Sequence, residues 1–149
     1  MLDAAPNRLT LRASGNTAPV PGSRWVRLPA SATAPALARD AVRDLLASIP
    51  IDGETGELVV LLVSEVVTNA LLHGEGPIGM ALESSDGQLT IGVADRCPQR
   101  TLELRHPGPE ATSGRGLQFL DEFAARWWVE QGDGAKTVWF RVDFPTPDP

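Results

Sequence analysis

The chain has 149 residues, a formal net charge of −6 and one cysteine, Cys97. This length fits a single domain with its own core, and one cysteine excludes an intrachain disulfide and fits a reducing compartment. Because the positive charge is almost all arginine, with Lys136 the only lysine, the composition argues against a general nucleic-acid binder. No signal peptide is apparent, and no apolar run approaches the ~20 residues of a membrane span. We therefore expect a soluble, cytoplasmic protein without membrane contact.

The two ends of the chain differ in composition from its middle. Residues 1–23 are rich in Ala, Pro, Gly, Ser, Asn and Thr without an apolar period, which predicts a flexible arm, and residues 145–149 predict a flexible tail. The domain is therefore expected over residues 24–144. It begins with a short strand over residues 24–28. Apolar residues at helical spacing then predict an amphipathic helix over residues 34–49.

The stretch Leu58 to Gly74, LVVLLVSEVVTNALLHG, is the most informative part of the sequence. Glu65, Asn69 and His73 recur every four residues in it, so they share one face of a helix. A strand would also place them on one face, but the run is too long for an ordinary strand. Buried polar groups without partners cost about 1–3 kcal/mol each, so this polar row is expected to face a ligand.

The second half of the chain predicts strands, a lid and one more helix. Alternating apolar residues on both sides of the Asp-Gly pair at 86–87 predict a hairpin. Residues 96–113 carry prolines and glycines without a period, which predicts a long lid loop. Residues 115–125 return to a helical pattern, and residues 127–144 read as a second hairpin whose Trp-Trp pair serves packing or an interface. The expected result is an α/β fold with about five strands and helices on one face.

Three clusters at the ends of these elements resemble a known nucleotide site. They are SEVVTNALLHG, VADRCP with Asp95 directly after an alternating strand, and SGRGLQFL, whose Gly-x-Gly-Leu opens a helix. In this order they resemble the GHKL ATPase superfamily and, more narrowly, the anti-sigma-factor serine/threonine kinases, from about Trp25 to Phe144. The resemblance implies a Bergerat-type ATP-binding fold, which is a two-layer α/β sandwich with a mixed sheet.

The resemblance also implies roles for three of these residues. The residue matching Glu65 is the general base that activates the attacking hydroxyl or water, and the one matching Asn69 binds Mg²⁺ through its amide oxygen. One helical turn between them places base and metal side by side, as phosphoryl transfer requires. The residue matching Asp95 accepts a hydrogen bond from the adenine amino group, because an ionised carboxylate only accepts.

The phosphate end of the implied ATP site involves the third cluster. Gly114 and Gly116 let the backbone approach the phosphates, and the helix starting near Leu117 points its free N–H groups at them. Thr137 on the last strand matches a family threonine near the adenine and Asp95.

The functional hypothesis is an ATP- and Mg²⁺-dependent protein serine/threonine kinase of the anti-sigma type. It would bind a sigma factor or other transcription regulator and phosphorylate an anti-sigma-factor antagonist protein, and the resemblance implies a homodimer. Cys97 stands where the superfamily usually has a glycine, and it motivates the alternative of a module that acts by protein sequestration only. An ATP-hydrolysing domain beside a sensor is disfavoured, because no dimerisation helix pair or phospho-accepting histidine motif is present. His73 reads as a dipole partner or packed side chain, and the roles of Arg105 and His106 stay open.

Overall fold

The computed structural model describes residues 23–96, 114–132 and 134–146. Most of the expected lid, with Cys97, Arg105 and His106, lies outside the described residues, as do residues 1–22 and 147–149. The elements in chain order are β1 (Ser23–Leu28), α2 (Ala34–Leu46), α3 (Gly53–His73), β2 (Glu75–Ser85), β3 (Gln88–Arg96), α4 (Gly114–Phe123), β4 (Arg126–Gly132) and β5 (Ala135–Asp143).

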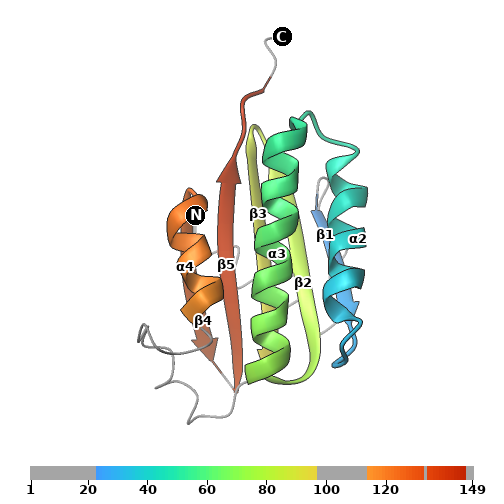
Figure 1. Cartoon of the computed structure of the whole chain (residues 1–149), viewed down its shortest axis with the longest axis vertical. Coiled ribbons are helices and arrows are strands. Elements are labelled where there is room, and N and C mark those ends of the chain that lie inside the picture. Colours follow the sequence, from blue (N-terminus) through green and yellow to red (C-terminus); the bar gives the residue numbers. More distant parts are fainter. Residues whose placement is uncertain (1–22, 97–113, 133, 147–149) are drawn as a thin grey trace.

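The strands form one five-stranded sheet in the order β1-β2-β3-β5-β4. All three helices lie on the same face of this sheet, so the predicted two-layer α/β sandwich is confirmed (Figure 1). The expectation of a mixed sheet is wrong, because each of the four neighbouring strand pairs is antiparallel. The two hairpins supply two of these pairs, and β5 completes the sheet by inserting between β3 and β4.

The first hairpin turns at the predicted Asp-Gly pair. Asp86 has φ 43° and Gly87 has φ 81°, and Asp86 is the one non-glycine residue with positive φ among the described residues. Two successive positive φ values give the type of two-residue turn that matches the twist of its strands. This turn sets the register in which Leu89, Ile91 and Val93 of β3 face the helices with Ile78, Met80 and Leu82 of β2.

Helix α3 lies at the centre of the helical layer. Its N-cap is Asp52, whose carboxylate accepts a hydrogen bond from the Thr55 backbone N–H at 2.7 Å. By length and apolar composition α3 could span a membrane, against the expectation that no run approaches that length. In this fold its apolar side packs in the core, through Val59, Val60, Leu62, Val63, Val66, Val67 and Ala70.

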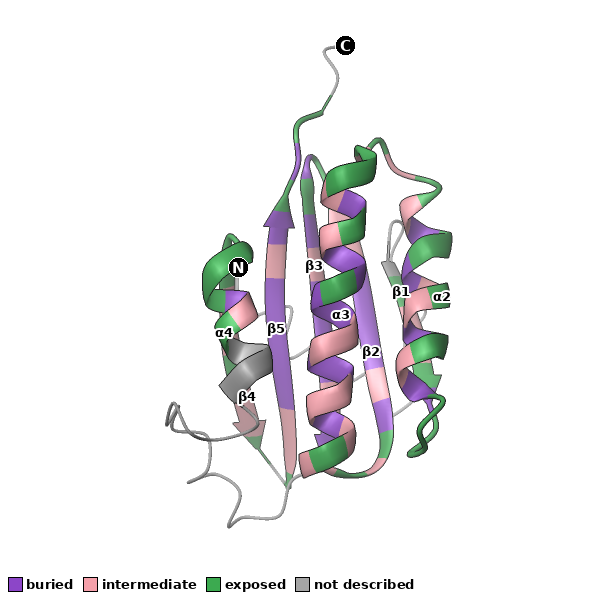
Figure 2. Ribbon diagram, viewed as in Figure 1, coloured by how far each residue is buried: buried purple, intermediate pink, exposed green. Residues whose placement is uncertain are grey.

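The core lies between the helices and the sheet. Figure 2 shows buried residues along β2, β3 and β5 behind α3, and exposed residues on the outer sides of the helices. In β5 and the residue after it, the predicted apolar face is confirmed, since Val138, Phe140, Val142 and Phe144 are all buried in this core. Leu120 of α4 joins them, while Phe119 packs at the edge of the cluster.

Candidate functional site

The predicted polar row of α3 is present on one side of an otherwise buried helix. Glu65, Asn69 and His73 are each half-buried, while Val66, Val67 and Ala70 between them are buried. Ser64, beside Glu65, accepts a hydrogen bond from Nη1 of Arg39 at 3.2 Å, which ties α2 to this part of α3. Asn69 and His73 each have an interaction partner.

The C-terminal end of α3 meets the end of β3 at Gly74. A Cβ atom placed on Gly74 would lie 2.6 Å from Oδ1 of Asp95, a distance that real Cβ atoms do not show. Gly74 has φ −100°, so glycine is needed here for space and not for a left-handed conformation. The missing side chain lets Asp95 lie against the end of the polar row.

Asp95 is buried and has a cationic neighbour. Its side chain is 1% exposed, and Nζ of Lys136 lies 3.8 Å from its Oδ2. The two residues are cross-strand partners in the β3–β5 register, so they share the helix-bearing face of the sheet. Taking a carboxylate out of water is costly unless a partner compensates, and Lys136, itself 14% exposed, supplies that charge.

Thr137 does not lie beside Asp95. It pairs with Ala94, so its side chain is on the opposite face of the sheet from Asp95 and Lys136. Lys136 and Gly74 are the neighbours of Asp95 that sequence reasoning missed. The alternation of β5 places Lys136 on the same face as Val138. Only the register between β3 and β5 shows that Lys136 lies opposite Asp95.

The glycines of the third cluster lie inside a helix. Helix α4 begins at Gly114, so Gly114, Gly116 and Leu117 form its first turn instead of preceding it. This turn follows the lid segment directly, and α4 packs beside α3. The free backbone N–H groups of such a turn suit anion binding, which keeps these three residues as predicted phosphate neighbours.

The donor set on α3 fits a magnesium–phosphate group. Mg²⁺ uses few protein ligands and keeps waters and phosphate oxygens, and a half-buried amide such as that of Asn69 could serve as one of those few ligands. Within residues 23–96, 114–132 and 134–146, no cluster of three or more His, Cys, Asp or Glu could hold a metal by itself. A metal in this row therefore depends on the phosphates that accompany it.

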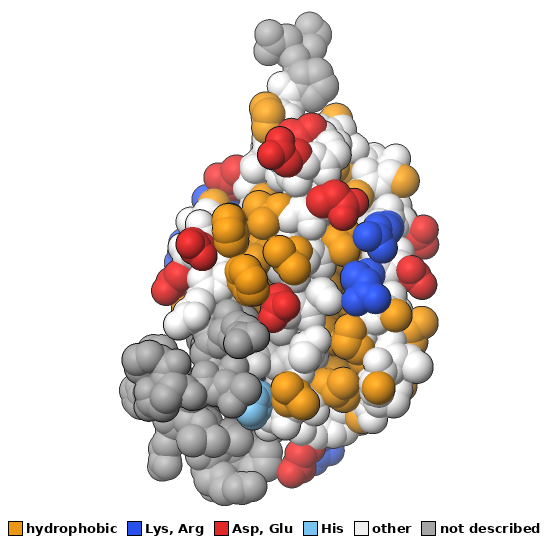
Figure 3. All heavy atoms as spheres, in the orientation of Figure 1, with side chains coloured by type: hydrophobic (Ala, Val, Ile, Leu, Met, Phe, Trp, Pro, Cys, Tyr) orange, Lys and Arg blue, Asp and Glu red, His pale blue; other side chains and the backbone are white. Residues whose placement is uncertain are grey.

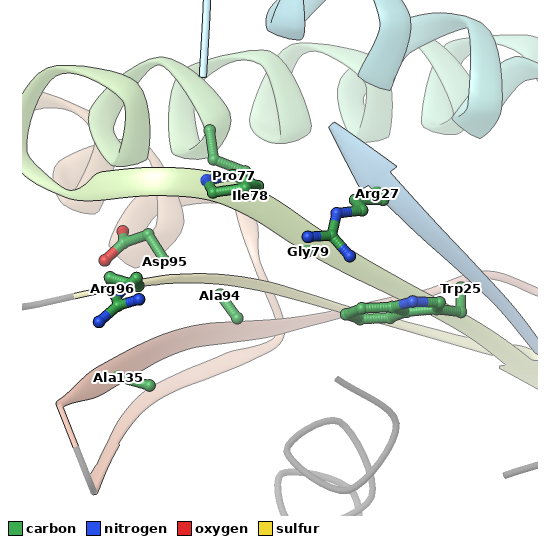
Figure 4. A pocket seen from close by; sticks show the side chains of 9 residues that line it. All are labelled: Trp25, Arg27, Pro77, Ile78, Gly79, Ala94, Asp95, Arg96 and Ala135. Carbon is green, nitrogen blue, oxygen red and sulfur yellow. The ribbon is translucent and has the colours of Figure 1, made fainter. Parts of the chain in front are cut away.

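A pocket of about 240 Å³ lies on the helix-free face of the sheet, at the same end of the strands as Asp95. Its lining residues are Trp25, Arg27, Pro77, Ile78, Gly79, Ala94, Asp95, Arg96 and Ala135. Figure 4 shows Asp95 pointing toward the helices, while Ala94 and Trp25 lie on the opposite side of the strands. The pocket thus reaches Asp95 from the helix-free face and contains no residue of the α3 polar row.

Comparison with known proteins agrees with this geometry. Residues 28–142 match the model of the family described as "Histidine kinase-like ATPase domain". No curated protein matches the sequence at a significant level.

Two solved structures are similar in fold. One is that of the RsbU and RsbW domains of Rv1364c from Mycobacterium tuberculosis, with TM-score 0.66 and 23% identity over 84% of this chain and 33% of that chain. The other is the SiaB–SiaC complex from Pseudomonas aeruginosa, with TM-score 0.57 and 16% identity over 95% of this chain and 97% of that chain. This chain therefore spans about a third of the first of these relatives.

Proposed function

This chain belongs to the histidine kinase-like ATPase domain family, and on that premise we propose that it is an ATP- and Mg²⁺-dependent protein serine/threonine kinase of the anti-sigma-factor type. The observation that supports the proposal is the close approach of the C-terminal end of the α3 polar row to Asp95 at Gly74. The polar row of α3 supplies Glu65 and Asn69, and the end of β3 supplies the buried carboxylate of Asp95.

Each of these side chains has a task in phosphoryl transfer. Asp95 would accept a hydrogen bond from the adenine amino group, and Asn69 would hold Mg²⁺, which would supply positive charge against the phosphates. Glu65 removes the proton from a serine or threonine hydroxyl as its oxygen bonds to the γ-phosphorus and the bond to the β–γ bridging oxygen breaks. ADP leaves with that oxygen, and the first turn of α4 contacts the phosphates.

The proposed substrate and regulator are proteins. One structure of similar fold is a complex of SiaB with SiaC, which supports a protein partner for this chain as well. The helix-bearing face carries hydrophobic side chains among acidic ones (Figure 3), and Leu61, Leu72 and Phe123 of α3 and α4 are exposed. We assign an anti-sigma-factor antagonist as the phosphorylated protein and a sigma factor or other transcription regulator as the second partner of a cytoplasmic homodimer.

The test replaces Glu65 and follows the γ-phosphoryl group. Glu65→Ala is expected to keep ATP binding and to lower transfer of labelled phosphate by about 100-fold or more, the usual contribution of a general base. The acceptor is a candidate antagonist protein or, in its absence, water. Glu57→Ala is the matched control, because Glu57 is an exposed residue of the same helix. Unchanged transfer after Glu65→Ala would contradict the assignment.

The Asp95–Lys136 pair favours one alternative function. A carboxylate already engaged by a lysine is less available to adenine, so the fold would serve as a sequestration module only. In that case Asp95→Asn would leave partner binding unchanged, and the purified protein would transfer no label from γ-labelled ATP.

A further inference from the structure

The pocket on the helix-free face combines one tryptophan, two arginines and two small residues. Trp25 and Arg27 belong to β1, Gly79 to β2, and Ala94 and Arg96 to β3, and all five line the pocket. We call these five residues the arginine pocket. The strand registers place Arg27, Gly79 and Ala94 in one row across the three strands, and the last two, which are small, form the floor. The proposed kinase activity uses none of the five.

The arginine pocket lies beside a bulge in β2. Glu75 pairs with Arg96 and Gly79 pairs with Ala94, so β2 advances by four residues where β3 advances by two. The additional residues include Pro77, which has no N–H group for the strand ladder and which also lines the pocket. Bulges of this kind interrupt regular pairing and are frequent next to functional sites. The hollow is thus a consequence of how β2 enters the sheet.

The indole of Trp25 forms one wall of the arginine pocket. A Cβ atom on Gly79 would overlap this ring, so the ring lies directly over the glycine. Trp25 is half-buried and lines the pocket, so part of its ring surface is open to a ligand. An indole offers a large apolar surface on which another aromatic ring can stack. This wall therefore suits an aromatic group.

The two arginines lie on either side of the floor. Figure 4 shows Arg27 and Arg96 on opposite sides of Ala94. They come from β1 and β3, which are two strand spacings apart, or about 10 Å. The stem of Arg96 packs against Gly76, where a Cβ atom would lie 3.2 Å from Cδ of the arginine. Both guanidinium groups thus border the same small hollow.

The arginine pocket is a positively charged place in a chain of net charge −6. Among the residues that the structure describes, no carboxylate forms an ion pair with Arg27 or Arg96, not even Glu75, which is opposite Arg96 in the strand register. Asp95 is the one acidic residue that lines the pocket. Its carboxylate points toward the helices and lies near Lys136. The chemistry of the hollow is therefore complementary to an anion.

We propose that the arginine pocket is a binding site for a small aromatic anion, with one or two rings and an acidic group such as a carboxylate. The ring stacks on Trp25 above Gly79 and Ala94, and the acidic group lies between the guanidinium groups of Arg27 and Arg96. Guanidinium N–H groups match the oxygens of such a group in a planar, two-pronged geometry. The volume of about 240 Å³ is below the usual range of drug-sized sites, which favours a small molecule. The site is independent of the proposed kinase activity.

The experiment titrates the full-length, ¹⁵N-labelled protein with naphthoate, a two-ring carboxylate, and separately with naphthylmethanol, its uncharged counterpart. Naphthoate should shift the amide and indole signals of the arginine pocket in a saturable manner. The double variant Arg27→Gln/Arg96→Gln should bind naphthoate about five- to tenfold more weakly, because two exposed charge pairs are lost, and bind naphthylmethanol as the wild type does. Arg24→Gln is the matched control, since Arg24 is an exposed residue of β1 on the helix-bearing face. Equal naphthoate affinity of the wild type and the double variant would overturn the proposal.

The same spectra show where naphthoate binds. Shifts confined to α3 and α4 near the exposed Leu61 and Phe123 would mean that the probe binds apolar side chains on the other face, which would contradict the site. Ala94→Leu adds a side chain to the floor and should abolish saturable binding of both probes. The Trp127 indole, which donates to Asp121 at 2.8 Å, reports whether this variant is folded. Binding of naphthoate by folded Ala94→Leu with wild-type affinity would also overturn the proposal.

Discussion

At the scale of single residues, two positions determine the surroundings of Asp95, the residue that we propose binds adenine. Gly74 lets the end of α3 approach the carboxylate, and Lys136 compensates its charge from the neighbouring strand. Gly74 closes the SEVVTNALLHG cluster, whereas Lys136 lies outside the three clusters. Both act through Asp95, so their effects should appear in stability and in nucleotide affinity together.

Replacing Gly74 by alanine tests the close approach. The added Cβ meets Asp95 at 2.6 Å, so α3 or β3 must shift, and overpacking of this kind costs about 1–3 kcal/mol. We expect urea unfolding of Gly74→Ala to show this loss and calorimetry to show weaker ATP binding. Gly53→Ala is the control, because nothing lies within 4 Å of a Cβ at the other end of the same helix. Equal stability of the two variants would refute the role of Gly74.

Replacing Lys136 by methionine tests the buried pair. Removing one partner leaves a carboxylate that is 1% exposed with less compensation, and breaking a buried pair costs up to about 3–5 kcal/mol. The double variant Asp95→Asn/Lys136→Met should be more stable than Lys136→Met alone, because no buried charge is left. A double-mutant cycle by urea unfolding measures this coupling, and additive effects of the two substitutions would mean that the pair contributes nothing.

Sequence reasoning at this scale succeeded where a local period was sufficient. The four-residue spacing of Glu65, Asn69 and His73 predicted a shared helix face, and the structure has it. It did not identify Lys136, and not Thr137, as the residue opposite Asp95, because that pairing depends on strand register. Register is a property of two distant segments, and no local pattern determines it.

At the scale of elements, strand β4 is an edge strand of the sheet and carries Glu130, whose carboxyl is partly removed from water. Glu130 lies on its helix-free side, and burial raises the pKa of the Glu130 carboxyl above its ordinary value. A carboxyl whose pKa is higher in the fold than in the unfolded chain binds a proton on folding. Stability therefore falls as the pH rises from the unfolded pKa through the folded one.

Glu130→Gln should remove this dependence. We expect the variant to have a higher free energy of unfolding than the wild type at pH 7 and a similar one below pH of about 4, where the carboxyl is protonated in both states. Urea unfolding across this range is the measurement, and Glu122→Gln, an exposed residue of α4, is the control. Equal free energies of unfolding for the wild type and Glu130→Gln at both pH values would contradict the raised pKa of Glu130.

Most helices and strands were predictable from the sequence, and the differences between their predicted and observed bounds have local causes. Helix α3 starts at Gly53, directly after its Asp52 cap, with a first turn that has no apolar pattern. Helix α2 ends at Leu46 and not at Ile49, since the last apolar residues follow in turns. The sheet is antiparallel instead of mixed because strand direction depends on the insertion of β5, which hydropathy does not reveal.

At the scale of the whole molecule, the two faces of one sheet have different tasks. The helix-bearing face holds the core, the polar row of α3 and Asp95, while the helix-free face holds Trp25, Trp139 and Trp128. The sequence predicted the first face, because its motifs lie on elements with clear periods. For the second face it indicated only that the Trp-Trp pair serves packing or an interface, because Trp25, Trp139 and Trp128 come together only in the assembled sheet.

Calorimetric titration with ATP tests whether Asp95 and Asn69 belong to one ATP–Mg²⁺ site, as we propose. The wild type should bind ATP saturably and more weakly when EDTA removes Mg²⁺. Asp95→Asn should weaken binding by about 10- to 100-fold, the value of a hydrogen bond to a charged group. The exposed control Asp40→Asn should bind as the wild type does. Binding by the wild type that is unaffected by Asp95→Asn, or no binding at millimolar ATP, would contradict the account.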